Sequence, residues 1–319
     1  MVDHRLRKGG LLHPGLPTVP TPEQDGIWCA ARPSFNVRSF GYEEVGMSVV
    51  EVDRPREGIV RITLNRPERL NTLTGELVAA LLAELTRLAT DRTCRVVVLT
   101  GAGRGFCAGL DLTGYTGTQE QPADEAPAPH VDPIAGLDRQ RDIARLAVQL
   151  HQLPQPVISA INGPAAGGGL ALACASDIRM AATGAVFAVG FLRAGFSACD
   201  IGLSWLLPRI VGTGRAHELM LTGRRWDTAE ALRIGLVTHV AEPEDLMDLV
   251  LEEAAEILRN PPFSVELTKQ GMWASVENPS FTNAVEFENR QQILSSLTAD
   301  RAEAARAFLE KRDPDYVWG

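Results

Sequence analysis

Two glycine-bearing segments, each shortly after an apolar run, are the residues best suited to chemistry in this sequence. The first is GFCAGLDL at 105–112, which follows RVVVLT, and the second is NGPAAGGGL at 162–170, which follows PVISAI. Successive glycines let a backbone approach a ligand closely with its N–H groups free. The second segment leads into residues of helical composition, so its N–H donors coincide with the positive end of a helix dipole. Two such points facing each other would form an oxyanion hole, which suits a thioester carbonyl that becomes an enolate.

Asp200, in the segment GFSACDIG at 195–202, is the other candidate for chemistry. An aspartate that faces an apolar, dry pocket has a raised pKa and could move a proton on a substrate carbon. Aspartate is also among the favoured N-caps, and residues 201–207 are predicted to be helical. Proton transfer and helix capping are therefore both open roles for Asp200.

Beyond its N-terminal part, the chain alternates between strand and helix signals. Leucines at helical spacing predict an amphipathic helix at 74–89 with Thr74 as its N-cap, and a second helix is expected at 137–153. From about residue 203 to the end the pattern is helical, except at 236–240. This order predicts an α/β fold in which a βα core is followed by a helical region. Apolar runs rich in β-branched residues predict the strands of that core, at 59–64, 95–100, 157–161, 178–182 and 186–189.

Composition divides the chain into three parts. Residues 1–46 carry scattered prolines in polar sequence, which predicts a poorly ordered extension. This extension is either a flexible arm or an artefact of the gene start, with the natural start at Met47. Residues 47–250 form the predicted core, and residues 251–319 form the helical C-terminal region. Within the core, residues 113–135 are rich in Gly, Pro, Asp and Glu and predict a mobile acidic loop.

Charge and cysteine usage exclude several classes of protein. A net charge of −9 argues against a nucleic-acid-binding surface, because phosphate binding needs clustered Lys and Arg. The five cysteines form no CxxC pair and the six histidines show no ligand spacing, so we expect a reducing compartment and no metal. No apolar run approaches the ~20 residues that cross a bilayer, and no secretory signal is present. We therefore expect a cytoplasmic protein without a membrane partner.

Several motifs, in order along the chain, resemble the signatures of the crotonase superfamily, which includes enoyl-CoA hydratases and isomerases. The resemblance covers residues 47–316 and implies a spiral of ββα repeats with a helical C-terminal region for trimerisation. It also implies an acyl-CoA substrate, coenzyme A as part of that substrate with no covalently bound cofactor, and a homotrimer or dimer of trimers. The motifs are NRPERLNTL (65–73), GRGFCAGLDL (103–112), PVISAINGPAAGGGLALACASDIRMA (156–181), ELMLTGRRWDTAEALRIGLV (218–237) and AFLEKRDPDY (307–316).

The resemblance also assigns roles to individual residues. It places the two oxyanion donors on the backbone N–H groups of Leu110 and Gly168. It further implies a lining for the entrance of the CoA site, made of Glu68, Arg69, Leu70, Ala108 and Leu112.

Both carboxylates of the family's hydratases are missing from the matching positions. The glutamate expected two residues after the GGG is Ala171, and the second glutamate falls on Phe191. Counting back from Leu207 aligns Asp200 with an aspartate of the dienoyl-CoA isomerase branch, if one residue is inserted. The resemblance therefore implies double-bond isomerisation, or hydration by a single-carboxylate route, with Asp200 as the proton carrier. A non-catalytic acyl-CoA-binding homologue is the alternative.

Two other classes of enzyme fit the sequence poorly. The glycines at 101–105 are not followed by a helix and a second acidic strand end, as a dinucleotide site requires. A serine hydrolase would need a GxSxG turn, whereas Ser159 lies inside a predicted buried strand.

The remaining polar and aromatic candidates receive structural interpretations. The family resemblance implies structural roles for Asp111 and Asp177. His151 is expected to contact the end of its helix, and Trp205 is expected in the core or the wall of an acyl pocket. Lys269 is expected to be solvated, with contact to a CoA phosphate of a neighbouring subunit as the alternative.

Overall fold

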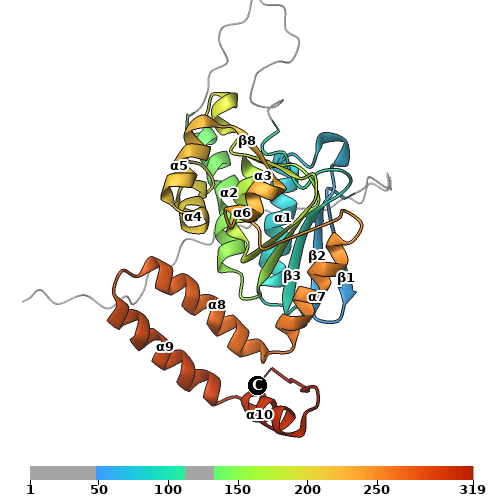
Figure 1. Cartoon of the computed structure of the whole chain (residues 1–319), viewed down its shortest axis with the longest axis vertical. Coiled ribbons are helices and arrows are strands. Elements are labelled where there is room, and N and C mark those ends of the chain that lie inside the picture. Colours follow the sequence, from blue (N-terminus) through green and yellow to red (C-terminus); the bar gives the residue numbers. More distant parts are fainter. Residues whose placement is uncertain (1–47, 112–132, 319) are drawn as a thin grey trace, which may run out of the picture. The chain divides into compact units, whose positions relative to one another are not determined.

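A six-stranded sheet is the centre of the fold in this computed structural model, which describes residues 48–111 and 133–318 (Figure 1). The strand order is β1-β2-β3-β4-β6-β9, and every neighbouring pair is parallel except β1 and β2. The architecture is thus α/β with a mainly parallel sheet, as the sequence predicts. The strands are β1 Val50–Arg56, β2 Ile59–Leu64, β3 Val96–Gly101, β4 Val157–Ile161, β6 Ile178–Ala182 and β9 His239–Ala241.

A smaller sheet carries the second glycine segment. Its strand order is β5-β7-β8, with β5 at Ala165–Ala166, β7 at Val186–Ala188 and β8 at Arg225–Asp227. Helices cover both sheets and fill the C-terminal part. They are η1 Pro67–Arg69, α1 Gly75–Leu88, α2 Pro133–Gln152, α3 Gly168–Ala175, η3 Phe191–Ala194, α4 Leu203–Val211, α5 Thr213–Thr222, α6 Thr228–Arg233, α7 Leu246–Leu258, α8 Pro262–Glu277, α9 Phe281–Ser296 and α10 Ala299–Glu310.

The large sheet is buried on both faces. Successive side chains of a strand point to opposite sides, and an apolar cluster covers each side. On one face, Val96 of β3 belongs to an apolar cluster that includes Val250 of α7. On the other face, Val97 belongs to a larger cluster that includes Leu77 of α1 and residues of α2 and α3. Leu251 and Ala254 of α7 belong to the same cluster as Val250. No helix in the described stretches is long and apolar enough to cross a bilayer.

The predicted strands and the helix at 74–89 are confirmed within one or two residues. Thr74 caps α1, since its hydroxyl accepts the Leu77 N–H at 3.2 Å. Two expectations about secondary structure were wrong. Residues 133–135 belong to α2 rather than to an acidic loop, because a proline suits the first helical turn. Residues 225–227 form β8 within a stretch predicted to be helical, and three residues are too few to show a strand period. The predicted extension 1–46, Met47 and residues 113–132 lie outside the described residues.

The C-terminal helices attach to the core through a buried ion pair. Lys269 of α8 is 3% exposed, and its ammonium lies 2.7 Å from the carboxylate of Asp177. It also donates to the carbonyl oxygens of Leu150 and Gln155. The expectation of a solvated Lys269 was therefore wrong. Burial lowers the pKa of Lys269, and the negative charge of Asp177 opposes that effect.

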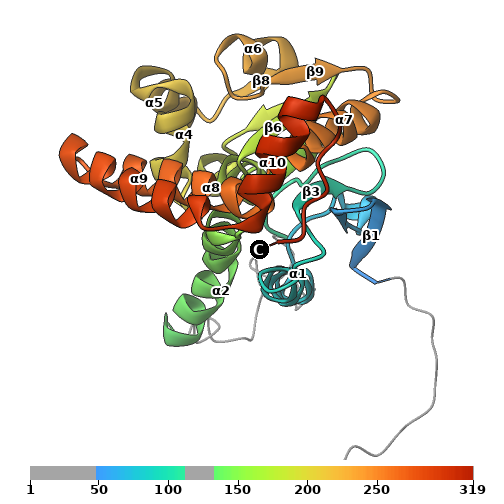
Figure 2. The same ribbon diagram turned by 90° about the horizontal axis from the view of Figure 1, so that it is seen from below.

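Asp177 has the structural role that was expected of it. Its carboxylate accepts the Val157 N–H at 2.8 Å and the indole N–H of Trp273 at 3.0 Å, in addition to the contact with Lys269. It thus joins β4 to α8, and α8 in turn lies beside α9 (Figures 1 and 2). A buried pair with this many hydrogen bonds fixes one docking geometry.

Replacing Lys269 with Met should lower the free energy of unfolding by about 3–5 kcal/mol, because it leaves the buried Asp177 carboxylate without its counter-charge. Urea unfolding at neutral pH measures this change. The matched control is Arg141→Met, which removes a cation from the exposed pair with Asp138. This control should change stability by less than about 0.5 kcal/mol. Equal changes in the free energy of unfolding for the two variants would show that the buried pair contributes no more than the exposed pair.

Candidate active site

The two glycine segments meet through backbone contacts. The Cys107 N–H donates to Pro164 O at 3.1 Å, and the Ala166 N–H donates to Cys107 O at 3.0 Å. A side-chain carbon on Gly169 would lie 2.0 Å from Cys107 O, so only glycine permits this approach. The structure thus brings together two segments that lie about 60 residues apart in the sequence.

Leu110 and Gly168, the predicted oxyanion donors, lie at this junction. Gly109 has φ 101°, and a carbon added to it would lie 3.4 Å from the nitrogen of Gly168. Gly168 is the first residue of α3, where helical N–H groups have no partner within the helix. Among the described residues, neither the Leu110 N–H nor the Gly168 N–H has a protein acceptor. The neighbouring Gly167 N–H, by contrast, donates to Ala188 O.

Apolar side chains surround these donors. A carbon added to Gly168 would meet Leu73 at 2.8 Å and Ile201 at 3.2 Å, and one added to Gly167 would meet the Phe191 ring at 3.6 Å. Phe191, in η3, and Ala171, in α3, are the positions where the resemblance implies glutamates, and both are buried. N–H donors in such surroundings stabilise a developing negative charge more than the same donors would in water.

Asp200 directly precedes Ile201, whose side chain contacts the Gly168 position, and it does not cap a helix. α4 begins at Leu203 with Gly202 as its N-cap, so the expected capping role of the Asp200 side chain was wrong. Its Oδ1 instead accepts the Ile201 N–H at 2.8 Å and the side-chain amide of Gln140 from α2. Burial raises the pKa of Asp200, and these two hydrogen bonds oppose the rise. Asp200 therefore titrates at a higher pH than an exposed aspartate.

Ile201 connects Asp200 to Gly168, one of the two predicted oxyanion donors. Its side chain is 3% exposed and packs against Gly168, while its own φ is 47°. A β-branched residue at positive φ is an outlier, and such strain amounts to about 1–3 kcal/mol and clusters at functional sites. The sequence shows no sign of this strain, because an isoleucine in an apolar segment is ordinary.

The segment assigned to the CoA entrance lies beside the first glycine segment. The Ala108 N–H donates to Leu70 O at 2.9 Å, so these two predicted residues are adjacent. Glu68 and Arg69 are exposed on η1, and Leu112 lies outside the described residues. The role of these residues at a CoA entrance stays a prediction.

Sequence reasoning missed Asn71, whose side chain holds the segment at 66–71 against the turn at 102–105. It is fully buried, and its amide donates to Ala102 O at 3.0 Å and to Gly105 O at 2.8 Å. Its oxygen accepts the Arg66 N–H at 2.8 Å. Asn71 has φ 56°, a conformation that asparagine tolerates better than most residues. Its place in the motif at 65–73 was the only available signal.

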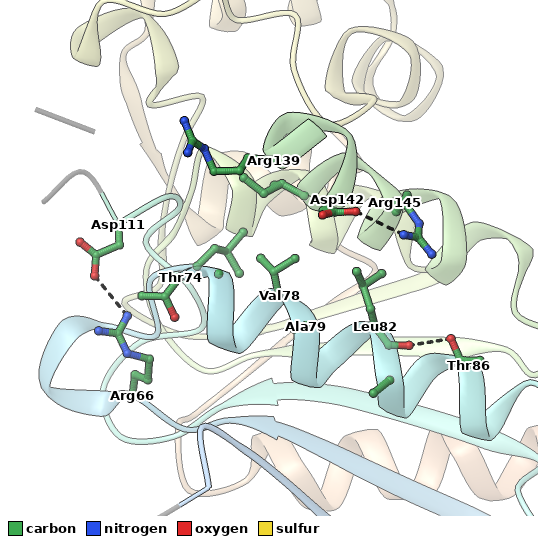
Figure 3. Close-up of a pocket in the computed structure, with 14 residues that line it drawn as sticks. Arg66, Thr74, Val78, Ala79, Leu82, Thr86, Asp111, Arg139, Asp142 and Arg145 are labelled. Atoms are coloured by element: carbon green, nitrogen blue, oxygen red, sulfur yellow. Dashed lines mark hydrogen bonds and ion pairs between the residues drawn. The ribbon is translucent and has the colours of Figure 1, made fainter. Parts of the chain in front are cut away.

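A cleft of about 810 Å³ opens between α1 and α2 (Figure 3). Val78 and Leu82 of α1 give it an apolar wall, and Arg139 of α2 lies across from them. At one end, Arg66 pairs with Asp111 at 3.2 Å, which is consistent with the structural role expected of Asp111. The cleft is lined by Arg66, Leu73, Thr74, Gly75, Val78, Ala79, Leu82, Ala83, Thr86, Asp111, Arg139, Asp142, Ile143 and Arg145.

Leu73 relates this cleft to the oxyanion donors. It lines the cleft, bridges to Leu110 through parallel backbone pairing, and contacts the position of a Gly168 side chain. Leu110, Gly168 and Asp200 are not part of the cleft wall itself. The site thus has two compartments, an apolar cleft and a polar junction, that meet at Leu73.

The ring of His151 packs against the rings of Trp205 and Trp273. The His151 ring lies 4.1 Å from the ring of Trp273 and 6.0 Å from that of Trp205, measured between centroids. Burial lowers the pKa of His151, which keeps the imidazole neutral at physiological pH. Trp205 packs against the main apolar cluster, in agreement with the expected core position. Both residues belong to the packing of α2 and α4.

Comparisons with known proteins identify the family of this chain. The profile of the enoyl-CoA hydratase/isomerase family matches residues 54–318. The probable enoyl-CoA hydratase echA12 of Mycobacterium leprae is 40% identical over 284 residues, covering 88% of this chain and 93% of that protein. The 1,2-epoxyphenylacetyl-CoA isomerase of Escherichia coli is 38% identical over 82% of this chain and 95% of its own length. The crystal structure of an enoyl-CoA hydratase from Bacillus anthracis superposes with a TM-score of 0.77 at 34% identity, covering 85% of this chain and all of that one. The chain belongs to the enoyl-CoA hydratase/isomerase family.

Proposed function

We propose that this protein is an acyl-CoA isomerase that stabilises a thioester enolate and moves one proton with Asp200. The N–H groups of Leu110 and Gly168 would bind the carbonyl oxygen. The observation that carries the proposal is the junction itself, where two backbone donors have no protein acceptor among the described residues and lie in apolar surroundings. Ile201, which packs against Gly168, directly follows the half-buried Asp200. The apolar cleft between α1 and α2 would take the acyl chain.

A single carboxylate is sufficient for moving a double bond. Asp200 takes a proton from the α-carbon of a 3-enoyl thioester, and the electron pair moves toward the carbonyl oxygen to form a dienolate. The two N–H groups stabilise that oxyanion, since it carries more charge than the ground-state carbonyl. Asp200 then returns the same proton to the γ-carbon, which leaves the 2-enoyl thioester. No water enters the balance, and Asp200 ends as it began.

Hydration needs more of the site than isomerisation does. A water molecule must lose a proton as it attacks the β-carbon, and the α-carbon must gain one. In this protein the expected glutamate positions hold Ala171 and Phe191, so Asp200 would have to serve both transfers. The epoxyphenylacetyl-CoA isomerase relative supports isomerisation by its name, while the echA12 relatives carry hydratase names. Isomerisation is therefore the proposed reaction, and hydration is a second outcome that the test can give. Binding of acyl-CoA without any turnover would contradict the proposal.

Asp200→Asn should lower kcat for isomerisation by about 10²–10⁴, because the amide cannot take the proton. A 3-enoyl-CoA such as 3-hexenoyl-CoA gains the absorbance of a conjugated thioester on isomerisation, whereas crotonyl-CoA loses it on hydration. The matched control is Asp138→Asn, an exposed aspartate on α2. Wild-type activity should fall as the pH drops through the raised pKa of Asp200, since only the carboxylate form is a base. Full activity of Asp200→Asn would remove its assigned role.

Gly168→Val should lower turnover by at least about 10²–10³, the usual effect of losing one oxyanion donor. The new side chain would fill the space in front of the N–H group. Its nearest neighbours are the flexible ends of Leu73 and Ile201, so the fold should survive with an unchanged circular dichroism spectrum. Gly214→Val, which meets nothing within 4 Å, is the matched control. An active Gly168→Val enzyme would rule out the oxyanion assignment.

We also propose that the protein assembles as a trimer or a dimer of trimers. Large apolar side chains of the C-terminal helices are exposed in the single chain, including Phe281 at 83%, Leu297 at 78% and Phe308 at 84%. Apolar surface of this kind marks an interface between proteins. Light scattering after size exclusion should give three or six times the mass of one chain. Phe308→Glu should lower that mass, and a monomeric wild-type protein would contradict the proposal.

A further inference from the structure

Gln140 is the residue of α2 that reaches Asp200 across 60 positions of sequence. Its side-chain Nε2 donates to Asp200 Oδ1, and the Ile201 N–H donates to the same oxygen at 2.8 Å. Within the described residues, Gln140 is the one side chain that is hydrogen-bonded to the Asp200 carboxylate, and Oδ2 accepts no hydrogen bond there. Both side chains are half-buried.

We propose that Gln140 is a positioning residue that holds Asp200 Oδ1 and so directs Oδ2 to exchange the proton with the substrate. This proposal rests on the proposed role of Asp200. A carboxylate held by one donor alone still rotates about its side-chain torsions. A second donor on the same oxygen, from a different element, fixes the plane of the carboxylate and leaves the other oxygen free.

The hydrogen bonds also favour the ionised form of the carboxylate. Burial next to apolar side chains disfavours the charge of Asp200, and the donors on Oδ1 offset that effect. Gln140 suits this position because a neutral amide donates without a charge of its own. A glutamate there would place a second carboxylate against Asp200 and favour a shared proton.

Gln140 also relates Asp200 to the acyl cleft. Arg139, the residue before it, and Ile143, three residues after it, both line the cleft between α1 and α2 (Figure 3). The same helical turn therefore faces the cleft with one side and the Asp200 carboxylate with another. The position of this turn determines both the width of the cleft and the orientation of the proton carrier.

Gln140→Leu tests the proposal by removing the amide with little change in side-chain volume. We expect kcat for 3-hexenoyl-CoA isomerisation to fall about ten- to a hundred-fold, as expected for loss of a hydrogen bond to a charged group. The KM should change little. The acidic limb of the kcat/KM profile should move to higher pH, because the lost donor had lowered the pKa of Asp200. Gln152→Leu, at an exposed position of the same helix, is the matched control and should leave both readouts unchanged.

Gln140→Glu supplies a second test that does not depend on how well the leucine packs. This near-isosteric variant should move the acidic limb further to higher pH and lower kcat at neutral pH. An acidic limb at the wild-type position in both variants would overturn the inference, whatever the change in kcat. Asp200→Asn measured beside them separates the two proposals. If Asp200→Asn loses activity while the acidic limbs of the Gln140 variants stay at the wild-type pH, only the positioning role is rejected. If Asp200→Asn is active, the proposed function itself is rejected.

Discussion

The close approach of two backbones is the constraint on which the rest of this structure depends. Cys107 O lies where a side chain of Gly169 would be, and the two segments exchange hydrogen bonds through Cys107 and Ala166. This contact places the N-terminus of α3 beside the end of the first glycine segment. β3 and β4 are neighbouring parallel strands, so both segments leave the same edge of the sheet. The sheet register, the glycines and the position of α3 thus form one geometric requirement.

The surroundings of this junction combine apolar packing with local strain. Leu73, Phe191 and Ile201 keep the donors in apolar surroundings, and Ile201 does so from a left-handed backbone conformation. That conformation persists because the Ile201 side chain is buried and its N–H is hydrogen-bonded to Asp200. Electrostatic stabilisation in such a site needs no reorganisation of water when charge develops. The backbone strain at Ile201 is therefore linked to the position of the Asp200 carboxylate.

Sequence patterns predicted the parts of this protein whose signals are local. The predicted strands β2, β3, β4, β6 and β7, the helix α1 with its Thr74 cap and the two glycine segments each follow from residue types over a few positions. The family resemblance assigned the oxyanion role to Leu110 and Gly168, and that role stays a prediction.

The contacts of Asn71, Gln140 and Lys269 could not be predicted in this way. Each joins elements far apart in the chain, 119 positions for Lys269 and Leu150, and a polar side chain is expected to be solvated by default. The N-cap role considered for Asp200 was wrong because the positive φ of Ile201 and Gly202 delays the start of α4.

The two donors belong to the main chain, and this has a consequence for how such a site diversifies. A substitution at Leu110 changes a side chain and leaves its amide proton in place. In the proposed site, the anion-binding half would therefore be insulated from most single mutations, while the proton-carrying half would consist of side chains that any mutation can exchange. Alanine and phenylalanine at the two expected glutamate positions, with an aspartate retained nearby, are what this asymmetry permits. One fold can in this way keep the same backbone donors and change the proton-transfer side chains around them. This is compatible with relatives of one fold that carry hydratase names and isomerase names.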